Sequence, residues 1–153
     1  MTNDKNQYAY DKAKWHYGAD NFPSNQPNLF GFVHTGFFLT WLAENGLLSS
    51  FVLEESAAEV KTTIDRLSSP IALYEVWDGV LCGDMLNEKG NKFALWYYER
   101  KYFSDYAEVF FESECIYSVN PSWENYDLIK LVISKKYNKW IASKDKKIWQ
   151  FWR

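Results

Sequence analysis

The fold of this chain is set first by residues 33–45, which read Val33-His34-Thr35-Gly36-Phe37-Phe38-Leu39-Thr40-Trp41-Leu42-Ala43-Glu44-Asn45. On a helix, Phe37 and Trp41 lie on one stripe, and the residue after each lies on an adjoining stripe. Gly46 follows, and glycine is the commonest residue just past a helix end. The pattern therefore predicts a helix over about 33–45 that places bulky apolar side chains in a core.

Helical signals also prevail elsewhere. Helix N-termini are predicted by a capping box at 56–59, by Ser69-Pro70 and by Ser122. Asp11 could cap a short helix that leads into Trp15. Residues 51–53, 115–119 and 148–153 are typical of strands, although the last could also be a docking turn. We expect a mainly α, single compact helical domain of about five to seven helices, with room for a minor β element.

Length and composition indicate one domain. The 153 residues suit a single domain spanning 1–153. We divide it into a main part at 8–140, which carries the family resemblance described below, and a basic aromatic tail at 141–153. Aromatic residues make up 20% of the chain, a supply large enough to leave some for a binding surface. We expect the two cysteines to form no disulfide framework, the N-terminal residues to be no signal peptide, and no apolar run to span a membrane. We expect a cytoplasmic protein with no membrane partner.

The charge is divided along the chain. Residues 1–129 hold nine Lys or Arg against nineteen Asp or Glu, a balance of −10, and residues 130–153 hold eight against one, a balance of +7. An acidic body repels nucleic acid and attracts basic proteins. The basic tail with its tryptophans could bind single-stranded nucleic acid, but no recognition motif surrounds it, so we expect no nucleic-acid partner.

The two histidines, His16 and His34, are the first candidates for chemistry. With a carboxylate from Asp11, Asp20 or Asp84 they could form an acid/base pair or half a metal site. The favoured interpretation is structural: each imidazole bonds to backbone and ties the N-terminal loop to the first long helix. We expect no catalytic residue, no metal and no cofactor. The alternative is a pocket lined by Trp15, His16, Tyr17, His34 and Trp123.

Other candidate sites are weaker. Residues 84–91 offer oxygen ligands, but their spacing does not match a calcium loop and is better explained by a helix cap. Cys82 and Cys115 have no basic neighbour that would activate a thiol. Two groups of acidic residues could instead receive a basic partner: Glu54, Glu55 and Glu59, and Asp105, Glu108, Glu112 and Glu114.

Several blocks of rare residues follow one another in a distinctive order. They are Tyr10-Asp11-Lys12-Ala13-Lys14-Trp15-His16-Tyr17-Gly18, His34-Thr35-Gly36-Phe37-Phe38, Leu86-Asn87-Glu88-Lys89-Gly90-Asn91 and Ser122-Trp123-Glu124-Asn125-Tyr126. Over roughly residues 8–140 the chain resembles a family of small, single-domain bacterial proteins of unassigned function. Some similar proteins act as immunity proteins in polymorphic-toxin or contact-dependent growth-inhibition systems.

The resemblance implies an immunity protein that binds a cognate toxin domain and occludes its active site. The toxin would be basic, and a nuclease is the expected kind, so that the acidic groups above would mimic phosphates. On this hypothesis the protein is not an enzyme. The alternative hypothesis is a small enzyme or ligand-binding domain with a cleft around His16 and His34.

Overall fold

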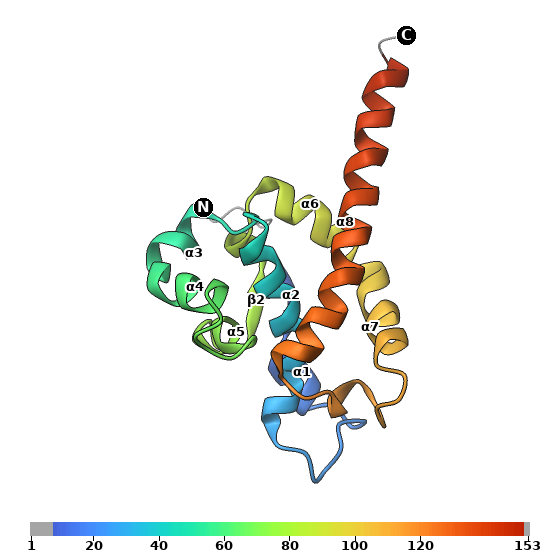
Figure 1. Cartoon of the computed structure of the whole chain (residues 1–153). Helices are drawn as coiled ribbons and strands as arrows, with labels where there is room; N and C mark the ends of the chain where they lie inside the picture. The colour runs from blue at the N-terminus through green and yellow to red at the C-terminus, as the bar shows by residue number, and fades with distance from the viewer. Residues whose placement is uncertain (1–7, 152–153) are drawn as a thin grey trace.

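The computed structural model describes the backbone of residues 8–151 and the side chains of residues 8–145, and it is mainly α-helical (Figure 1). The α-helices are α1 Ala13–Tyr17, α2 Val33–Glu44, α3 Ser50–Glu55, α4 Ala57–Ile64, α5 Ala72–Val76, α6 Glu88–Trp96, α7 Phe103–Val109 and α8 Trp123–Phe151. A small sheet joins β1 Ala9–Lys12 to β2 Val80–Cys82, and η1 Asn28–Gly31, η2 Gly83–Met85 and η4 Ile116–Ser118 are 3₁₀ turns. The predicted fold class is confirmed.

Helix α2 forms the centre of the domain, as its sequence predicts. Every side chain from Val33 to Ala43 is buried, and the helix ends at Glu44, just before Gly46 with its positive φ of 69°. Helices α4, α5 and α8 all contact it, and Figure 1 shows α3–α5 on one side and α7 and α8 on the other. Because α2 is apolar over most of its circumference, it is buried among other elements, and its polar residues His34, Thr35 and Thr40 are buried with it.

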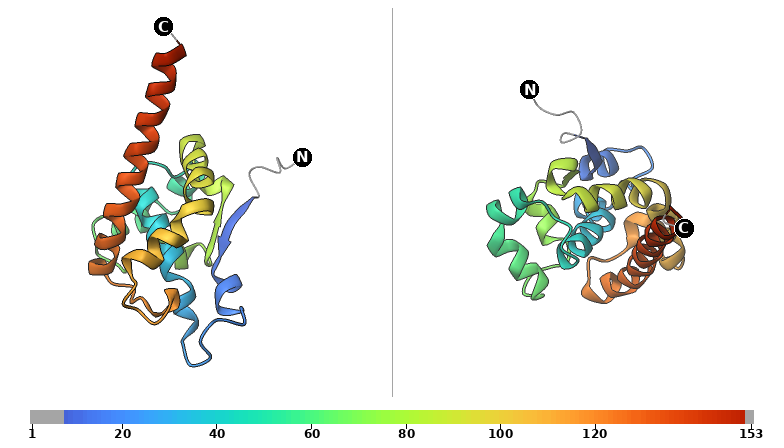
Figure 2. Two further views of the ribbon diagram at one scale, coloured as in Figure 1. Left: turned by 90° about the vertical axis from the view of Figure 1, so that its right-hand side faces the viewer. Right: turned by 90° about the horizontal axis from the view of Figure 1, so that it is seen from above.

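The N-terminal segment lies across the body as an edge strand. Strand β1 pairs antiparallel with β2, and the register shifts between Ala9 and Asp11. A shift of this kind interrupts the regular alternation of side chains between the two faces of a strand. Figure 2 shows β1 beside β2, on the face of the domain away from α8. The segment therefore brings Asp11 and His16 to α2, where they contact Thr35 and His34.

The second half of the chain closes the other side of α2. Between α6 and α7, residues Tyr98–Tyr102 (η3) form a π-helix. Helix α8 then packs Tyr126, Ile129, Ile133 and Trp140 on the body. Its C-terminal end continues beyond the other elements (Figures 1 and 2). Ser122 caps α8 through a hydrogen bond from the Asn125 N–H of 3.1 Å, as predicted.

Local patterns misassigned several short elements. Residues 51–53 and 115–119 were predicted as strands, but the first lies in α3 and the second contains η4. Helix α4 begins after Ser56, but the predicted capping box does not form, because the Ser56 hydroxyl donates to Val52 O at 2.8 Å and accepts no N–H group of α4. Asp11 does not cap α1 but belongs to β1.

The tail also differs from its prediction. Helix α8 continues through Phe151, so the described part of 148–153 is neither a strand nor a turn, and residues 152–153 lie outside the described residues. Within residues 8–151, no helix combines the length and the hydropathy that a membrane crossing requires.

Candidate functional site

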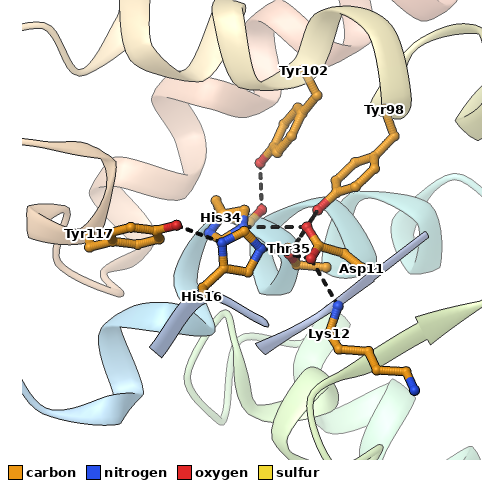
Figure 3. Close-up of polar contacts among 8 residues, drawn as sticks. All are labelled: Asp11, Lys12, His16, His34, Thr35, Tyr98, Tyr102 and Tyr117. Carbon is orange, nitrogen blue, oxygen red and sulfur yellow. Dashed lines mark hydrogen bonds and ion pairs between the residues drawn. The ribbon is translucent and has the colours of Figure 1, made fainter. Parts of the chain in front are cut away.

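Three polar side chains from three elements meet on the N-terminal side of α2. Asp11 comes from β1, His16 from α1 and His34 from the first turn of α2. His16 Nε2 lies 2.7 Å from Asp11 Oδ1, the two Nε2 atoms lie 3.2 Å apart, and His34 Nε2 lies 3.5 Å from Asp11 Oδ2. Figure 3 shows all three side chains pointing toward one another. The two histidines are eighteen residues apart in sequence, and only the tertiary fold joins them.

The Asp11 carboxylate is held in its ionised form. Its Oδ1 accepts the Lys12 N–H at 2.8 Å, and its Oδ2 accepts the Tyr98 hydroxyl at 2.6 Å and the Thr35 hydroxyl at 3.3 Å. Burial on its own would raise the pKa of Asp11, but the hydrogen bonds and charges of His16 and His34 outweigh burial and hold the pKa well below its usual value. The site therefore keeps a buried negative charge at neutral pH.

His34 is the most deeply buried member. Its side chain has no solvent exposure, and burial lowers the pKa of His34 although Asp11 opposes the shift. The imidazole is therefore neutral at pH 7 and has one nitrogen lone pair free to accept or ligate. Its Nδ1 atom is buried with no hydrogen-bond partner, an uncommon state for a polar atom in a folded protein.

His16 lies at the edge of the site. Its side chain is 13% exposed, and its Nδ1 lies 2.7 Å from the Tyr117 hydroxyl on η4 (Figure 3). Burial raises the pKa of Tyr117, so its hydroxyl keeps its proton at neutral pH. The Tyr102 hydroxyl approaches from η3 but donates to the backbone oxygen of His34, at 2.6 Å.

The spacing of the three donor atoms suits a metal ion. One donor atom from each of Asp11, His16 and His34 lies within 4.8 Å of the others. Ligands about 2.1 Å from a common ion are about 3.4 Å apart in tetrahedral geometry and about 3.0 Å apart at octahedral right angles. The observed separations are 2.7 Å from His16 Nε2 to Asp11 Oδ1, 3.2 Å between the two Nε2 atoms and 3.5 Å from His34 Nε2 to Asp11 Oδ2, and they bracket these values. Small side-chain movements would place all three around one ion.

The structure brings together only part of the predicted pocket. Trp15 is 51% exposed beneath the Lys12 ammonium, and the Tyr17 ring stacks on Phe32 with ring centroids 6.2 Å apart. Trp123 lies at the start of α8, where its Nε1 donates to Ser68 O at 3.0 Å. The two histidines therefore converge with Asp11, and the three aromatic residues of the predicted pocket contact other parts of the fold.

The other candidate carboxylates lie apart from the histidines. Asp20 is exposed in the loop after α1, and Asp84 accepts a hydrogen bond from the Cys82 thiol at 2.8 Å. The hydrogen bonds of the two imidazoles also differ from the favoured interpretation, which had each imidazole bonded to backbone. Both ring nitrogens of His16 and the Nε2 of His34 contact side chains instead.

The acidic residues divide between two faces. Six of them are exposed: Glu54, Glu55, Glu59, Glu108, Glu112 and Glu114. The first three belong to α3 and α4 and the others to α7 and the segment after it, and these elements flank opposite sides of α2 (Figure 1). Asp105 instead accepts the buried Tyr97 hydroxyl at 2.8 Å and lies 3.7 Å from Lys136.

Sequence reasoning missed the partners that complete the site. Thr35, Tyr98 and Tyr117 all donate to or contact the cluster, yet none of them was predicted as a site residue. Tyr98 begins the π-helix η3, and π-helical turns are frequent at functional sites. No residue pattern in the chain signals that turn.

Comparison with known proteins places the chain in a family. A family model described as a domain of unknown function, DUF7832, matches residues 9–119. The chain belongs to this family. The matched segment of the DUF7832 domain contains Asp11, His16, His34, Tyr98 and Tyr117, and it ends before α8. No curated protein and no solved structure matches the chain.

Proposed function

We propose that this DUF7832 domain binds a divalent transition-metal ion through Asp11, His16 and His34. The observation that carries the proposal is the convergence of the Asp11 carboxylate and two imidazole Nε2 atoms. His16 Nε2 lies 2.7 Å from Asp11 Oδ1, His34 Nε2 lies 3.5 Å from Asp11 Oδ2, and the two Nε2 atoms lie 3.2 Å apart. Asp11 is ionised and His34 is neutral at pH 7, the states in which carboxylate and imidazole ligate metals. These two ligands therefore need no change of net charge to bind.

The donor set favours transition metals over magnesium or calcium. Imidazole suits Zn²⁺, Fe²⁺, Ni²⁺ and Cu²⁺, whereas Mg²⁺ and Ca²⁺ prefer oxygen ligands. The outer hydrogen bonds also fit a metal site, because Tyr98 and Thr35 hold the carboxylate and Tyr117 holds the imidazole of His16. We propose binding and not turnover, because Asp11 is 4% exposed and His34 is fully buried, which leaves solvent access only at His16.

The proposal is tested by metal content and affinity of protein from which any affinity tag has been removed. The chain has only two histidines, both in the site, so background binding is small. Purified protein is titrated with Zn²⁺ against a chromophoric chelator, and bound metal is counted by mass spectrometry. We expect one ion per chain, with binding lost in Asp11→Asn and in His16→Gln.

Asp20→Asn and Asp84→Asn serve as matched controls, because each removes a carboxylate that lies outside the cluster. Both controls should bind Zn²⁺ as the unaltered protein does. Circular dichroism shows whether each variant is folded before its affinity is compared. Stoichiometric binding that survives both Asp11→Asn and His16→Gln would place the ion elsewhere and refute the proposal.

A second candidate function is the immunity activity that the family resemblance implies. It is supported by α3 and α4, where Glu54, Glu55 and Glu59 are exposed beside Phe51 and Leu53, which are 47% and 46% exposed. Acidic groups next to exposed apolar side chains suit a basic protein partner in the cytoplasm. Phe111 is also exposed beside Glu112 after α7, but the α3 and α4 side adds the exposed Ile64 and Leu67 to Phe51 and Leu53, so we propose that this side would contact a toxin domain.

Co-expression with the protein encoded by the adjacent gene tests this candidate, with growth and co-purification as readouts. Replacement of Glu54, Glu55 and Glu59 by Lys should abolish protection. The matched replacement of Glu108, Glu112 and Glu114 by Lys should leave protection intact. A neighbour that is harmless alone and does not bind would remove the immunity hypothesis.

A further inference from the structure

Tyr117 makes the only hydrogen bond described for the Nδ1 atom of His16. The two residues are 101 positions apart, and their atoms lie 2.7 Å from each other. Tyr117 is itself fixed, because Gln26 Nε2 donates to its backbone oxygen at 2.7 Å and the Phe22 ring packs 5.0 Å from its ring. The hydroxyl is therefore held at His16 by the rest of the fold.

In the ion-free site, the surroundings of His16 select one tautomer. A carboxylate can only accept, so the hydrogen in the 2.7 Å contact between Asp11 Oδ1 and His16 lies on Nε2. A neutral imidazole then has a bare Nδ1, which accepts the hydroxyl proton of Tyr117. Tyr117 thus donates in this state.

When an ion is bound through Nε2, the same ring must take the other tautomer. Nε2 gives its lone pair to the ion, so the single hydrogen of the neutral imidazole lies on Nδ1. That N–H now needs an acceptor, and the oxygen of the Tyr117 hydroxyl is in place at 2.7 Å. A hydroxyl can donate or accept, whereas a backbone carbonyl or a carboxylate can only accept.

His34 has no equivalent. Its Nδ1 is buried without a partner, so ligation through Nε2 would leave the Nδ1 hydrogen unpaired. Of the two imidazoles, only His16 keeps its outer hydrogen bond in both tautomers. Of the hydrogen bonds that the histidine Nδ1 atoms could add to ion affinity, only the bond between His16 and Tyr117 is therefore present in the described part of the chain.

We infer that Tyr117 is a positioning residue that sets ion affinity by accommodating both tautomers of His16. The inference rests on the proposed metal-ion binding. Tyr117 donates to Nδ1 while the site is ion-free and accepts from Nδ1 when the ion is bound, so the hydrogen bond between Tyr117 and His16 is kept. The Nε2–H bond from His16 to Asp11 is replaced by the bonds of both groups to the ion. Loss of an outer partner of a ligating histidine commonly weakens metal affinity by about 10–100-fold.

The test compares Tyr117→Phe with Tyr102→Phe. Each removes one buried hydroxyl near the site, but the Tyr102 hydroxyl bonds to the backbone oxygen of His34 and touches no ligating atom. Zn²⁺ affinity is measured by chelator competition, and long-range ¹H–¹⁵N spectra report the tautomer of each ring. With only two histidines in the chain, both rings can be assigned by one His16→Gln spectrum.

In the unaltered protein we expect the Nε2–H tautomer of His16 without Zn²⁺ and the Nδ1–H tautomer with Zn²⁺. Tyr117→Phe should bind about 10–100-fold more weakly, and Tyr102→Phe should bind as the unaltered protein does. Equal affinities for Tyr117→Phe and the unaltered protein, or an unchanged tautomer on Zn²⁺ addition, would overturn this inference and leave metal binding standing. Absence of binding by the unaltered protein would instead overturn the proposed function, and the inference with it.

Discussion

Replacement of Asp11 by Asn should destabilise the ion-free domain by about 3 kcal/mol, a value set by the bonds that the carboxylate makes. The carboxylate accepts from His16 at 2.7 Å and from Tyr98 at 2.6 Å, through different oxygen atoms. An amide has one accepting oxygen, so one of these buried donors would face an N–H group instead. A hydrogen bond to a charged group contributes about 1.5–3 kcal/mol, and an unsatisfied buried donor costs about 1–3 kcal/mol.

Part of this loss is recovered, because the Tyr98 hydroxyl already lies 2.8 Å from the Thr35 hydroxyl and can turn toward it. Urea unfolding with a chelator present measures the effect, as a lower midpoint with an unchanged slope. Thermal unfolding should show a decrease of about 6–12 °C for a domain of this size. Asp20→Asn, in an exposed loop, should change stability by less than about 0.5 kcal/mol. A loss below about 1 kcal/mol for Asp11→Asn would refute the account of the buried network.

Three further results are expected. Burial lowers the pKa of His34 in the folded protein, so below about pH 6.5, the pKa of histidine in the unfolded chain, the unfolded state binds more protons than the folded state. The free energy of unfolding should therefore fall by up to about 1.4 kcal/mol per pH unit between about pH 6.5 and pH 5. Urea midpoints that stay flat over this window would contradict the burial of a neutral His34. Gly36→Ala should cost about 1–3 kcal/mol in urea unfolding, because the added Cβ would lie 2.7 Å from Ile71 Cγ2 and 3.2 Å from Ile71 Cα. Burial and the hydrogen bond to Asp84 raise the pKa of Cys82 to about 12. In a Cys115→Ser variant, alkylation of Cys82 at pH 8 should therefore be more than about 100-fold slower than alkylation of free cysteine. A rate near that of free cysteine would show that the Cys82 thiol is exposed and its pKa is not raised.

Long, strongly patterned helices were the part of the fold that the sequence could predict. Helix α2 follows from its aromatic stripes and Gly46, and α8 follows from Ser122 and the apolar residues at three- and four-residue spacing behind it. Short segments were misassigned because their local composition is outweighed by tertiary contacts. Phe51-Val52-Leu53 has β propensity, yet the Ser49 hydroxyl accepts the Val52 N–H and begins a helix there.

The candidate site was predictable only in its components. The sequence singled out His16, His34 and a nearby carboxylate, but it could not choose among Asp11, Asp20 and Asp84, because that choice depends on the pairing of β1 with β2. Tyr98 lies 87 residues from its partner Asp11 in the sequence, and Tyr117 lies 101 residues from its partner His16. Such long-range contacts leave no periodic or spacing signal in a single sequence.

X-ray absorption spectroscopy of the Zn²⁺-loaded protein tests the central claim most directly, because it identifies the atoms bound to the ion. The account predicts a first shell of nitrogen and oxygen at about 2.0–2.1 Å, with the outer-shell scattering of two imidazole rings. The same spectrum from Asp11→Asn should lose intensity as the bound zinc is lost. A sulfur shell at about 2.3 Å would place the ion at a cysteine and contradict the assignment to Asp11, His16 and His34.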